Sequence, residues 1–340
     1  MLKDNFGRTL DYLRISITDR CNLRCVYCMP QEGVEWKPHG SILTFEEIIR
    51  ITKIIANLGI KNIKVTGGEP LLRRGASSLL NELKTIKGIG KVTLTTNGIL
   101  LSAYLDEADA AGHSLPDGIN ISLDALDCER YKQITRIENT ASAVSNALTV
   151  QPSAVLSGIE RLLKKRVTVK INCVPMRSVN EQEIIPLACL AKDNDITVRF
   201  IELMPIGAGA NFQPVAGKET AAIIEKEFGV MLPVDVHGSG PAVYYSVTGF
   251  KGKIGFINAV THGFCETCNR LRLTSEGFLK PCLSNAFGFN LKELMRNGAD
   301  DSEIAKAVIE TVSKKPRFHT LSDIYCAQEN HIIGMSMIGG

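Results

Sequence analysis

The sequence predicts an α/β protein whose core is a partial, open TIM-like barrel, (β/α)6, followed by a smaller C-terminal α+β region. Six apolar, β-branched segments alternate with amphipathic segments across the first two-thirds of the chain. This alternation is typical of parallel strands joined by right-handed crossovers. Six units are too few for a closed eight-stranded barrel. The alternation stops at a Gly-rich segment, residues 204–209, which we interpret as a hinge into the second region.

The expected elements follow from local periodicity. Strands are predicted at residues 13–18, 60–66, 91–96, 118–123, 167–174 and 197–203. Helices are predicted at residues 44–58, 75–86, 100–111, 154–165 and 180–193. The first helix opens with Thr44 and Glu47 in the spacing of a capping box. The predicted domains are a barrel over 1–205, a C-terminal region over 206–326 and a tail over 327–340.

Residues 137–151 interrupt this pattern with a stretch rich in Ser, Thr, Ala and Asn. We interpret the stretch as a loop insertion or a weak extra helix, without an assignable chemical role.

One face of the predicted strands is polar and cationic, whereas the opposite face is Leu, Ile and Val, which suits packing under helices. Barrel interiors are usually filled with bulky branched side chains, so a polar lumen indicates a charged ligand. The alternative is the solvated face of an open sheet. The polar positions are Arg14, Ser16, Thr18, Asn62, Lys64, Thr66, Thr93, Thr95, Asn120, Ser122, Asp124, Thr168, Lys170, Asn172 and Arg199.

Composition excludes several classes of protein. The net charge is only +3 and aromatic residues make up 6%, without an interleaved basic–aromatic stretch, which argues against a zinc-stabilised RNA-binding protein and against nucleic-acid partners. No apolar run approaches a membrane span, and the N-terminus does not resemble a secretory signal, so no membrane partner is expected. The 10 cysteines fall mostly into two groups, a pattern that indicates metal ligation in a reducing, cytoplasmic environment.

The first group is Cys21, Cys25 and Cys28, directly after the first predicted strand. Soft thiolates this close together select zinc, copper or an iron–sulfur cluster. A closed zinc site or an ordinary [4Fe–4S] site wants four protein ligands, and the neighbouring residues offer no obvious fourth. We therefore expect a cluster with one iron open to a non-protein ligand; the alternative is a zinc or structural thiol site.

The turn after the second strand, residues 66–70, reads Thr-Gly-Gly-Glu-Pro, where two glycines allow close approach of backbone amides to a ligand. Further polar residues follow the third and fourth strands, at Asn97 and Asp124. All of these lie at strand C-termini, the end at which barrel active sites are built.

The second group is Cys265, Cys268 and Cys282, again without a clear fourth ligand. The alternative is a Cys3His zinc site that uses His262. Arg270 and Arg272 would share one face of an extended segment, which suits bidentate binding of phosphate or carboxylate, unless they form an ordinary surface pair.

Two features of the remaining sequence complete the pattern. The apolar approach to the terminal Gly339 and Gly340 suggests that the tail docks on another part of the molecule. The other cysteines are expected to be small core residues; they are Cys128, Cys173, Cys189 and Cys326.

Together these motifs resemble the radical S-adenosylmethionine (SAM) superfamily and, within it, the GTP 3′,8-cyclase family, also called molybdenum cofactor biosynthesis protein A. The spacing Cys-x3-Cys-x2-Cys and the Gly-Gly-Glu-Pro turn resemble the superfamily in general. The second cysteine group with Arg270 and Arg272 inside it, and the terminal Gly-Gly, resemble the cyclase family in particular.

The resemblance implies a lyase that contains two [4Fe–4S] clusters, each with an open iron. SAM binds the N-terminal cluster and yields a 5′-deoxyadenosyl radical. The guanine of GTP binds the C-terminal cluster, and GTP becomes 3′,8-cyclo-7,8-dihydro-GTP, the first step of molybdenum cofactor biosynthesis. SAM contacts are implied for Tyr27, Gly68, Ser122 and Met204. GTP contacts are implied for Arg14, Lys64, Thr95, Lys170, Arg199, Arg270 and Arg272. Catalytic roles are implied for Arg270, Arg272, Gly339 and Gly340.

The implied partners are an electron donor such as flavodoxin or ferredoxin and the next enzyme, cyclic pyranopterin monophosphate synthase; the chain would be a monomer or a homodimer. The nearest alternative is another radical SAM enzyme with an auxiliary cluster, such as a peptide-modifying one. The family often has Lys-Ile-Arg where this chain has Asn62-Ile63-Lys64. One cation is absent and the other loses its fork geometry, so we expect altered triphosphate affinity.

Overall fold

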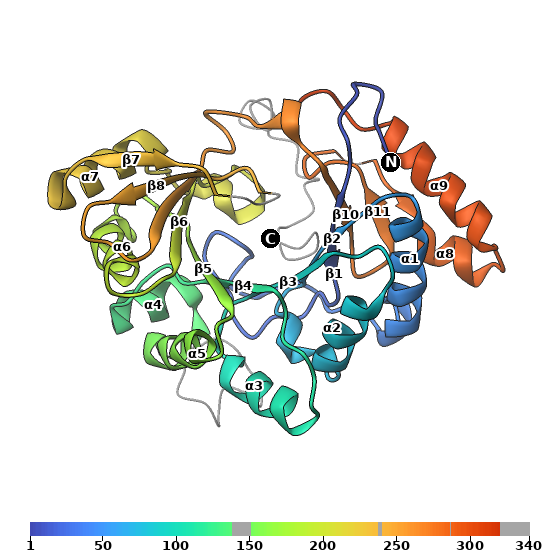
Figure 1. Ribbon diagram of the computed structural model, residues 1–340, viewed down its shortest axis with the longest axis horizontal. Helices are drawn as coiled ribbons and strands as arrows, with labels where there is room; N and C mark the ends of the chain where they lie inside the picture. Colours follow the sequence, from blue (N-terminus) through green and yellow to red (C-terminus); the bar gives the residue numbers. More distant parts are fainter. Residues whose placement is uncertain (138–150, 237–239, 286, 320–340) are drawn as a thin grey trace.

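The computed structural model of the protein describes residues 1–137, 151–236, 240–285 and 287–319. Its centre is one curved, twelve-stranded sheet with the strand order β12-β11-β10-β1-β2-β3-β4-β5-β6-β9-β8-β7. The strands form the inner layer of the molecule, and helices α1, α2, α3, α5 and α6 cover the outer side of the sheet (Figure 1).

All six predicted strands are confirmed, with ends that shift by one or two residues. They pair in parallel in chain order. Their bounds are β1 Tyr12–Ser16, β2 Asn62–Thr66, β3 Lys91–Thr96, β4 Gly118–Ser122, β5 Thr168–Cys173 and β6 Thr197–Ile201. The sheet ends at β12 and β7 instead of closing on itself, so the predicted open, partial barrel is confirmed.

The predicted helices are also confirmed. The Thr44 hydroxyl accepts a hydrogen bond from Glu47 N, and the Glu47 carboxylate accepts one from Thr44 N at 2.8 Å, which completes the expected capping box. The helices are α1 Phe45–Asn57, α2 Ala76–Thr85, α3 Leu101–Ala110, α5 Pro152–Lys164 and α6 Ile184–Asp193.

Within the barrel region, helix α4 (Cys128–Thr135) was not expected, because it is short and mostly polar; Asp127 caps its start. It lies just before the predicted insertion, whose residues 138–150 are outside the described part of the chain.

The prediction that the βα alternation stops near residue 204 is wrong. After β6 the chain forms α7 (Gly217–Phe228) and the antiparallel pair β7 (Met231–Val234) and β8 (Val243–Val247). It then enters β9 (Lys253–Ile257), which is parallel to β6. A further crossover is therefore present, and the β7–β8 hairpin interrupts its local pattern.

The chain then reaches the opposite side of the barrel. Strand β10 (Arg270–Leu273) pairs in parallel with β1, and β11 (Phe278–Lys280) and β12 (Phe289–Asn290) continue the sheet in antiparallel fashion. Helices α8 (Leu291–Arg296) and α9 (Asp301–Ser313) follow, and α9 packs beside α1 (Figure 1). Strands from beyond residue 205 thus flank the six-stranded core on both sides. The domain boundaries themselves stay a prediction.

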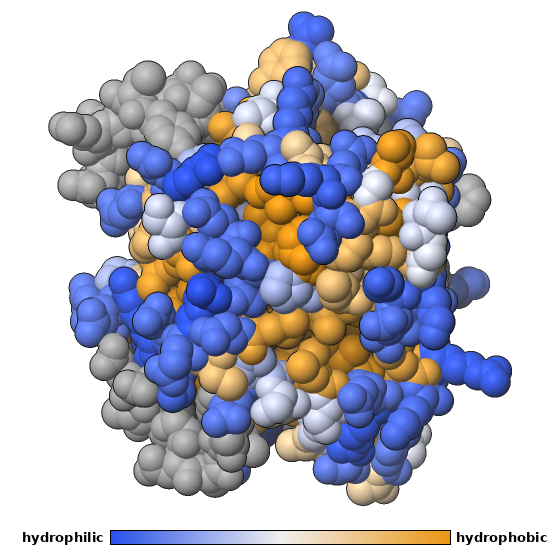
Figure 2. Space-filling view, turned by 90° about the vertical axis from the view of Figure 1, so that its left-hand side faces the viewer, coloured by the Kyte–Doolittle hydropathy of each residue, from blue (hydrophilic) through white to orange (hydrophobic). Residues whose placement is uncertain are grey.

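The β7 edge of the sheet lies on the side of the molecule that carries α7 and the β7–β8 hairpin. On this side apolar side chains gather amid hydrophilic ones (Figure 2). Among the exposed apolar residues of the molecule are Val230, Leu232 and Val243, in or beside the hairpin. Pro233 lies in β7 and lacks an N–H donor, which blunts this edge against further strand pairing. Within the described ranges, no helix combines the length and apolarity needed to span a membrane.

Candidate active site

The first cysteine loop lies directly beyond the carboxyl end of β1. Cys21, Cys25 and Cys28 are all partly buried. Burial, with smaller contributions from the nearby Glu69 carboxylate and the Cys28 thiol, raises the pKa of Cys21 to about 12. Burial and the neighbouring Cys28 thiol likewise hold the pKa of Cys25 well above its usual range. Three thiolates here would need a compensating cation, and a metal centre held by these cysteines would supply that charge.

The Gly-Gly turn is pressed against the segment that leads into this loop. Gly68 N donates to Thr18 O and Glu69 N to Arg20 O, both at 2.7 Å. A Cβ on Gly68 would lie 2.3 Å from Arg20 O, so no other residue fits without a backbone shift. The turn after β2 therefore fixes the position of the cysteine loop after β1.

Glu69 ties these loops to the end of β3. Its side chain is 1% exposed and accepts hydrogen bonds from the Thr96 hydroxyl at 2.7 Å and from the Asn97 backbone N at 2.6 Å. Burial raises the pKa of Glu69 to about 7, although these hydrogen bonds oppose the shift. The Asn97 side chain then donates to Asn22 Oδ1 at 2.8 Å, inside the cysteine loop.

Tyr27 connects the cysteine loop to β4 and β5. Its hydroxyl donates to Asp124 Oδ2 at 2.7 Å, and Asp124 Oδ1 accepts from Val174 N at 2.8 Å. Burial raises the pKa of Asp124 to about 6. On the other side, Gly209 packs against the carbonyls of Tyr27 and Met204. The residues expected to contact SAM thus include a connected pair, Tyr27 and Met204, while Gly68 lies in the turn after β2 and Ser122 ends β4.

The polar strand positions do share one face. Arg14 on β1 is directly opposite Lys64 on β2 and Arg272 on β10. Burial and the repulsion of Arg272 lower the pKa of Arg14 to about 9. Burial, together with Arg199 and Arg14, lowers the pKa of Lys64 well below its usual range. A row of crowded cations therefore crosses the inner face of the barrel.

A second group of polar side chains lies on β5 and β6. Arg199 is directly opposite Asn172 and donates from Nε and Nη2 to its Oδ1, at 2.9 and 2.6 Å. Lys170 Nζ donates to the Tyr244 hydroxyl at 3.2 Å. Tyr244 reaches Arg199 across Gly255, where a Cβ would lie 2.9 Å from the Tyr244 ring.

Within the described residues, no carboxylate forms an ion pair with these cations, namely Arg14, Lys64, Lys170, Arg199 and Arg270. Two enclosed polar atoms of the lumen, Arg14 Nε and Thr95 Oγ1, have no hydrogen-bond partner. Buried donors and cations are normally satisfied. The lumen is therefore built for a polyanionic ligand that supplies the missing acceptors.

The second cysteine group lies at the β10 side of the lumen. Cys268 N donates to Cys265 O, and the Arg270 guanidinium lies over the rings of Phe264 at 5.1 Å and Tyr12 at 5.9 Å. Burial works against ionisation of Cys268, but the Lys315 ammonium and a hydrogen bond from Arg270 N outweigh it, so the pKa of Cys268 lies below its ordinary value.

The alternative zinc site would need His262 as the fourth ligand of this group. His262 is exposed and contacts Thr261. Nowhere in the described part of the chain do three or more His, Cys, Asp or Glu side chains gather closely enough for one metal ion. A zinc ion needs its ligands at about 2.0–2.3 Å, whereas a cluster holds its cysteines farther apart on separate irons. The donor sets of both cysteine groups fit clusters.

Several neighbours were missed from the sequence. Tyr12, Tyr244, Arg8 and Lys315 come from outside the motifs and carry no local signal. Asn62, which replaces a family cation, instead donates to Asp11 at 3.2 Å, and Asn269 donates to the same carboxylate at 2.6 Å.

The remaining cysteines and the tail have mixed outcomes. Cys173 is buried, as expected, but Cys128 is exposed at the start of α4, so the expectation of a core role is wrong there; Cys189 is intermediate. Cys326, Gly339 and Gly340 lie outside the described residues.

Comparison with known proteins bears on this site. Residues 15–190 match the radical SAM superfamily model, and residues 196–321 match the model named Molybdenum Cofactor Synthesis C. The chain is 44% identical over 319 residues to the GTP 3′,8-cyclase of Clostridium perfringens (strain 13 / Type A), with 94% of each chain covered. It is 42% identical over 344 residues to that of Petrotoga mobilis, with 99% of each covered. The chain belongs to the GTP 3′,8-cyclase family of radical SAM enzymes.

Solved structures agree on the fold of this radical SAM family member. Streptococcus suis SuiB bound to S-adenosylmethionine matches with a TM-score of 0.56 at 17% identity, covering 94% of this chain and 69% of that one. SuiB bound to its precursor peptide SuiA matches with a TM-score of 0.59 at 16% identity, covering 96% and 69%. Membership of the radical SAM superfamily brings with it SAM and an iron–sulfur cluster as cofactors.

Proposed function

We propose that this chain catalyses the 3′,8-cyclisation of GTP in the first step of molybdenum cofactor biosynthesis, with GTP held in the lumen between the two cysteine groups. The observation that carries the proposal is the crowding of cations on the inner face: Arg14 lies directly opposite Lys64 on β2 and Arg272 on β10, and Arg14 Nε has no hydrogen-bond partner. A triphosphate supplies an acceptor for Arg14, and its charge offsets the mutual repulsion of the cations.

Cys21, Cys25 and Cys28 would hold the first [4Fe–4S] cluster. When bound there, the cluster supplies the electron that cleaves SAM and provides the hydrogen-abstracting radical. The chain's own residues would orient SAM. The backbone of the Gly68 turn would bind its polar end, and Tyr27, whose hydroxyl donates to Asp124, would contact it together with Ser122 and Met204.

Seven side chains would bind GTP, one group at the triphosphate and the other at the guanine base. Lys64, Lys170 and Arg199 would face the triphosphate, with Thr95 donating its free hydroxyl. Arg14 lies between this group and β10, so it would bridge the triphosphate to the nucleoside. This arrangement fixes the ribose relative to SAM, and positioning of this kind contributes most when reacting atoms are held near contact distance.

Cys265, Cys268 and Cys282 would hold a second [4Fe–4S] cluster that anchors guanine. Arg270 and Arg272 lie in β10, which follows Cys268 closely in the chain, and they would contact the base and act in the late steps of the reaction. Gly339 and Gly340 remain candidates for a catalytic role at the same site. Flavodoxin or ferredoxin as electron donor, cyclic pyranopterin monophosphate synthase as the next enzyme, and a cytoplasmic location belong to this proposal.

The test is GTP binding and turnover by the parent chain and Arg270→Ala. The parent, reconstituted without oxygen, should bind GTP and cyclise it in the presence of SAM and a strong reductant. Arg270→Ala should bind GTP more weakly or stop cyclisation while still cleaving SAM, because Arg270 lies opposite Tyr12 at the start of β1, whereas the first cysteine loop follows the end of that strand. Unchanged binding and cyclisation in this variant would remove the assigned role, and a parent that does not bind GTP would overturn the proposal.

A further inference from the structure

Lys315, two residues beyond α9, lies beneath the second cysteine group. It is 3% exposed, and its Nζ donates to Arg270 O at 2.9 Å and to Pro281 O at 2.5 Å. These carbonyls flank the group on both sides, since Arg270 follows Cys268 and Pro281 precedes Cys282. One ammonium therefore joins the two chain segments that present Cys268 and Cys282.

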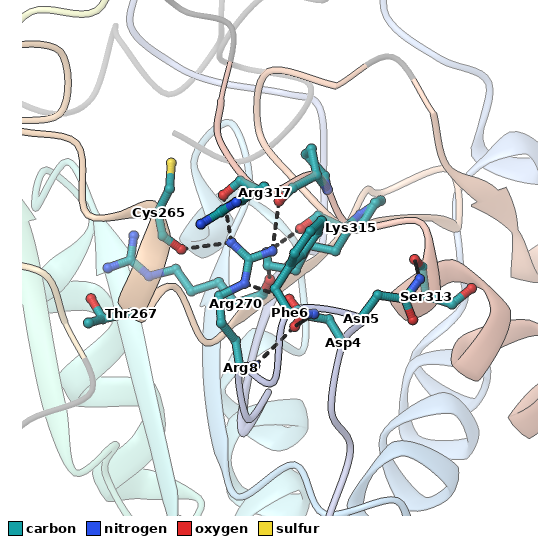
Figure 3. A network of polar contacts seen from close by, with 12 residues as sticks. Asp4, Asn5, Phe6, Arg8, Cys265, Thr267, Arg270, Ser313, Lys315 and Arg317 are labelled. Atoms are coloured by element: carbon teal, nitrogen blue, oxygen red, sulfur yellow. Dashed lines mark hydrogen bonds and ion pairs between the residues drawn. The ribbon is translucent and has the colours of Figure 1, made fainter.

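Arg8, near the N-terminus, links Cys265 to the segment that directly follows Lys315 (Figure 3). Its Nη1 donates to Cys265 O at 2.7 Å and to Arg317 O at 3.0 Å, and its Nη2 donates to Pro316 O at 2.7 Å. Its Nε donates to Asp4 at 2.5 Å. The guanidinium thus fixes Cys265 and the two residues that follow Lys315.

The two cations differ in their counter-charge. Asp4 neutralises Arg8, but in the described ranges no carboxylate pairs with Lys315. Burial lowers the pKa of Lys315, and the nearby Cys268 and Cys282 side chains oppose that shift electrostatically. An ammonium buried without an anion is strongly unfavourable. The anion that Lys315 faces is the thiolate group itself.

We infer that Lys315 is a positioning residue for the second cluster, whose ammonium is the fixed counter-charge that sets the cluster's reduction potential. The inference rests on the proposed second cluster. Reduction adds one electron to the cluster and breaks no bond, so the cluster becomes more negative by one charge. A fixed cation nearby favours that state, and its removal must lower the potential.

The experiment uses the full chain with Cys21, Cys25 and Cys28 all replaced by Ala, so that only the second cluster remains. Iron and acid-labile sulfide are measured, and the midpoint potential is titrated by electron paramagnetic resonance with dithionite as reductant. In this background, Lys315→Met removes the charge and Lys315→Arg keeps it. Lys314→Met is the matched control, since Lys314 is an exposed neighbour that pairs with Glu310.

Lys315→Met should lower the equilibrium constant for reduction about tenfold, a fall of about 59 mV for one electron. Lys315→Arg should restore most of the potential, and Lys314→Met should leave it unchanged. If Lys315→Met does not fold, Lys315→Gln carries the test, because the amide still donates to one carbonyl but carries no charge. A folded, iron-loaded Met or Gln variant with the parent's potential would overturn the inference while leaving the second cluster in place. A background protein without iron would instead overturn the second cluster, and the inference with it.

Discussion

Replacing Arg14 by Met should weaken GTP binding and at the same time stabilise the GTP-free chain. Burial and Arg272 lower the pKa of Arg14 from 12.5 to about 9. At about 1.36 kcal/mol for each pKa unit, holding this charge costs the GTP-free fold up to about 5 kcal/mol. Arg14 is only partly buried, so solvent screening reduces this figure, and we expect about 1–3 kcal/mol of added stability in the variant.

The loss of GTP affinity follows from the same side chain. A hydrogen bond to a charged group contributes about 1.5–3 kcal/mol, which corresponds to a roughly 10- to 150-fold rise in Kd. Isothermal titration calorimetry gives the affinity, and thermal unfolding of samples with equal iron content gives the stability. Arg161→Met, which removes a partly exposed arginine that pairs with Asp106 on the outer surface, is the control and should change neither quantity in this way. A variant with unaltered affinity, or one less stable than the parent without GTP, would refute the description of Arg14 as a crowded lumen cation that awaits an anionic ligand.

Three further predictions follow from other contacts. Tyr244→Phe removes the hydroxyl that accepts a hydrogen bond from the Lys170 ammonium. A hydrogen bond to a charged group contributes about 1.5–3 kcal/mol, so the Kd for GTP should rise at least about 10-fold while SAM affinity stays constant. Equal losses for both ligands would contradict this role. Gly68→Ala places a Cβ 2.3 Å from Arg20 O, so it should destabilise the chain by about 1–3 kcal/mol and cause loss of iron from the first site. Gly40→Ala, with open space around it, is the control and should have neither effect. Retained iron and unchanged stability in Gly68→Ala would argue against the close contact of this turn. Burial raises the pKa of Glu69 from 4.5 to about 7, so between these pH values the folded state holds a proton that the unfolded state releases. The free energy of unfolding should therefore fall by up to about 3 kcal/mol as pH rises from about 4.5 to 7. Glu69→Gln should flatten this part of the stability profile, and an unchanged slope would show that Glu69 is not the titrating group.

Local sequence predicted the barrel core because each of its strands carries its own signal. Alternation placed Arg14 and Lys64 on one face, and their register as direct neighbours confirms it. The capping box at Thr44 depends on residues within one turn of helix, so it too was visible. Elements with a strong local pattern need no knowledge of the rest of the chain.

The flanking strands could not be predicted in the same way. The parallel partners of β1 and β6 include β10 and β9, which lie far along the sequence, and the β7–β8 hairpin hides the crossover into β9. The same limit applies to the site: Arg8 donates to Pro316, 308 residues away. Lys315 and Tyr244 likewise reach the site only through tertiary packing, so the local sequence around them did not predict their contacts.

The most direct test of the central claim is transfer of the 3′ hydrogen of GTP. The anaerobically reconstituted chain is incubated with SAM, a strong reductant and GTP carrying deuterium at C3′, and the 5′-deoxyadenosine and nucleotide products are examined by mass spectrometry. We predict that deuterium appears in 5′-deoxyadenosine. GTP should be converted to a cyclised isomer that has lost the C3′ deuterium and gained one hydrogen from solvent. Cleavage of SAM without deuterium transfer, and with GTP recovered unchanged, would contradict the assignment of GTP as the substrate held in the lumen.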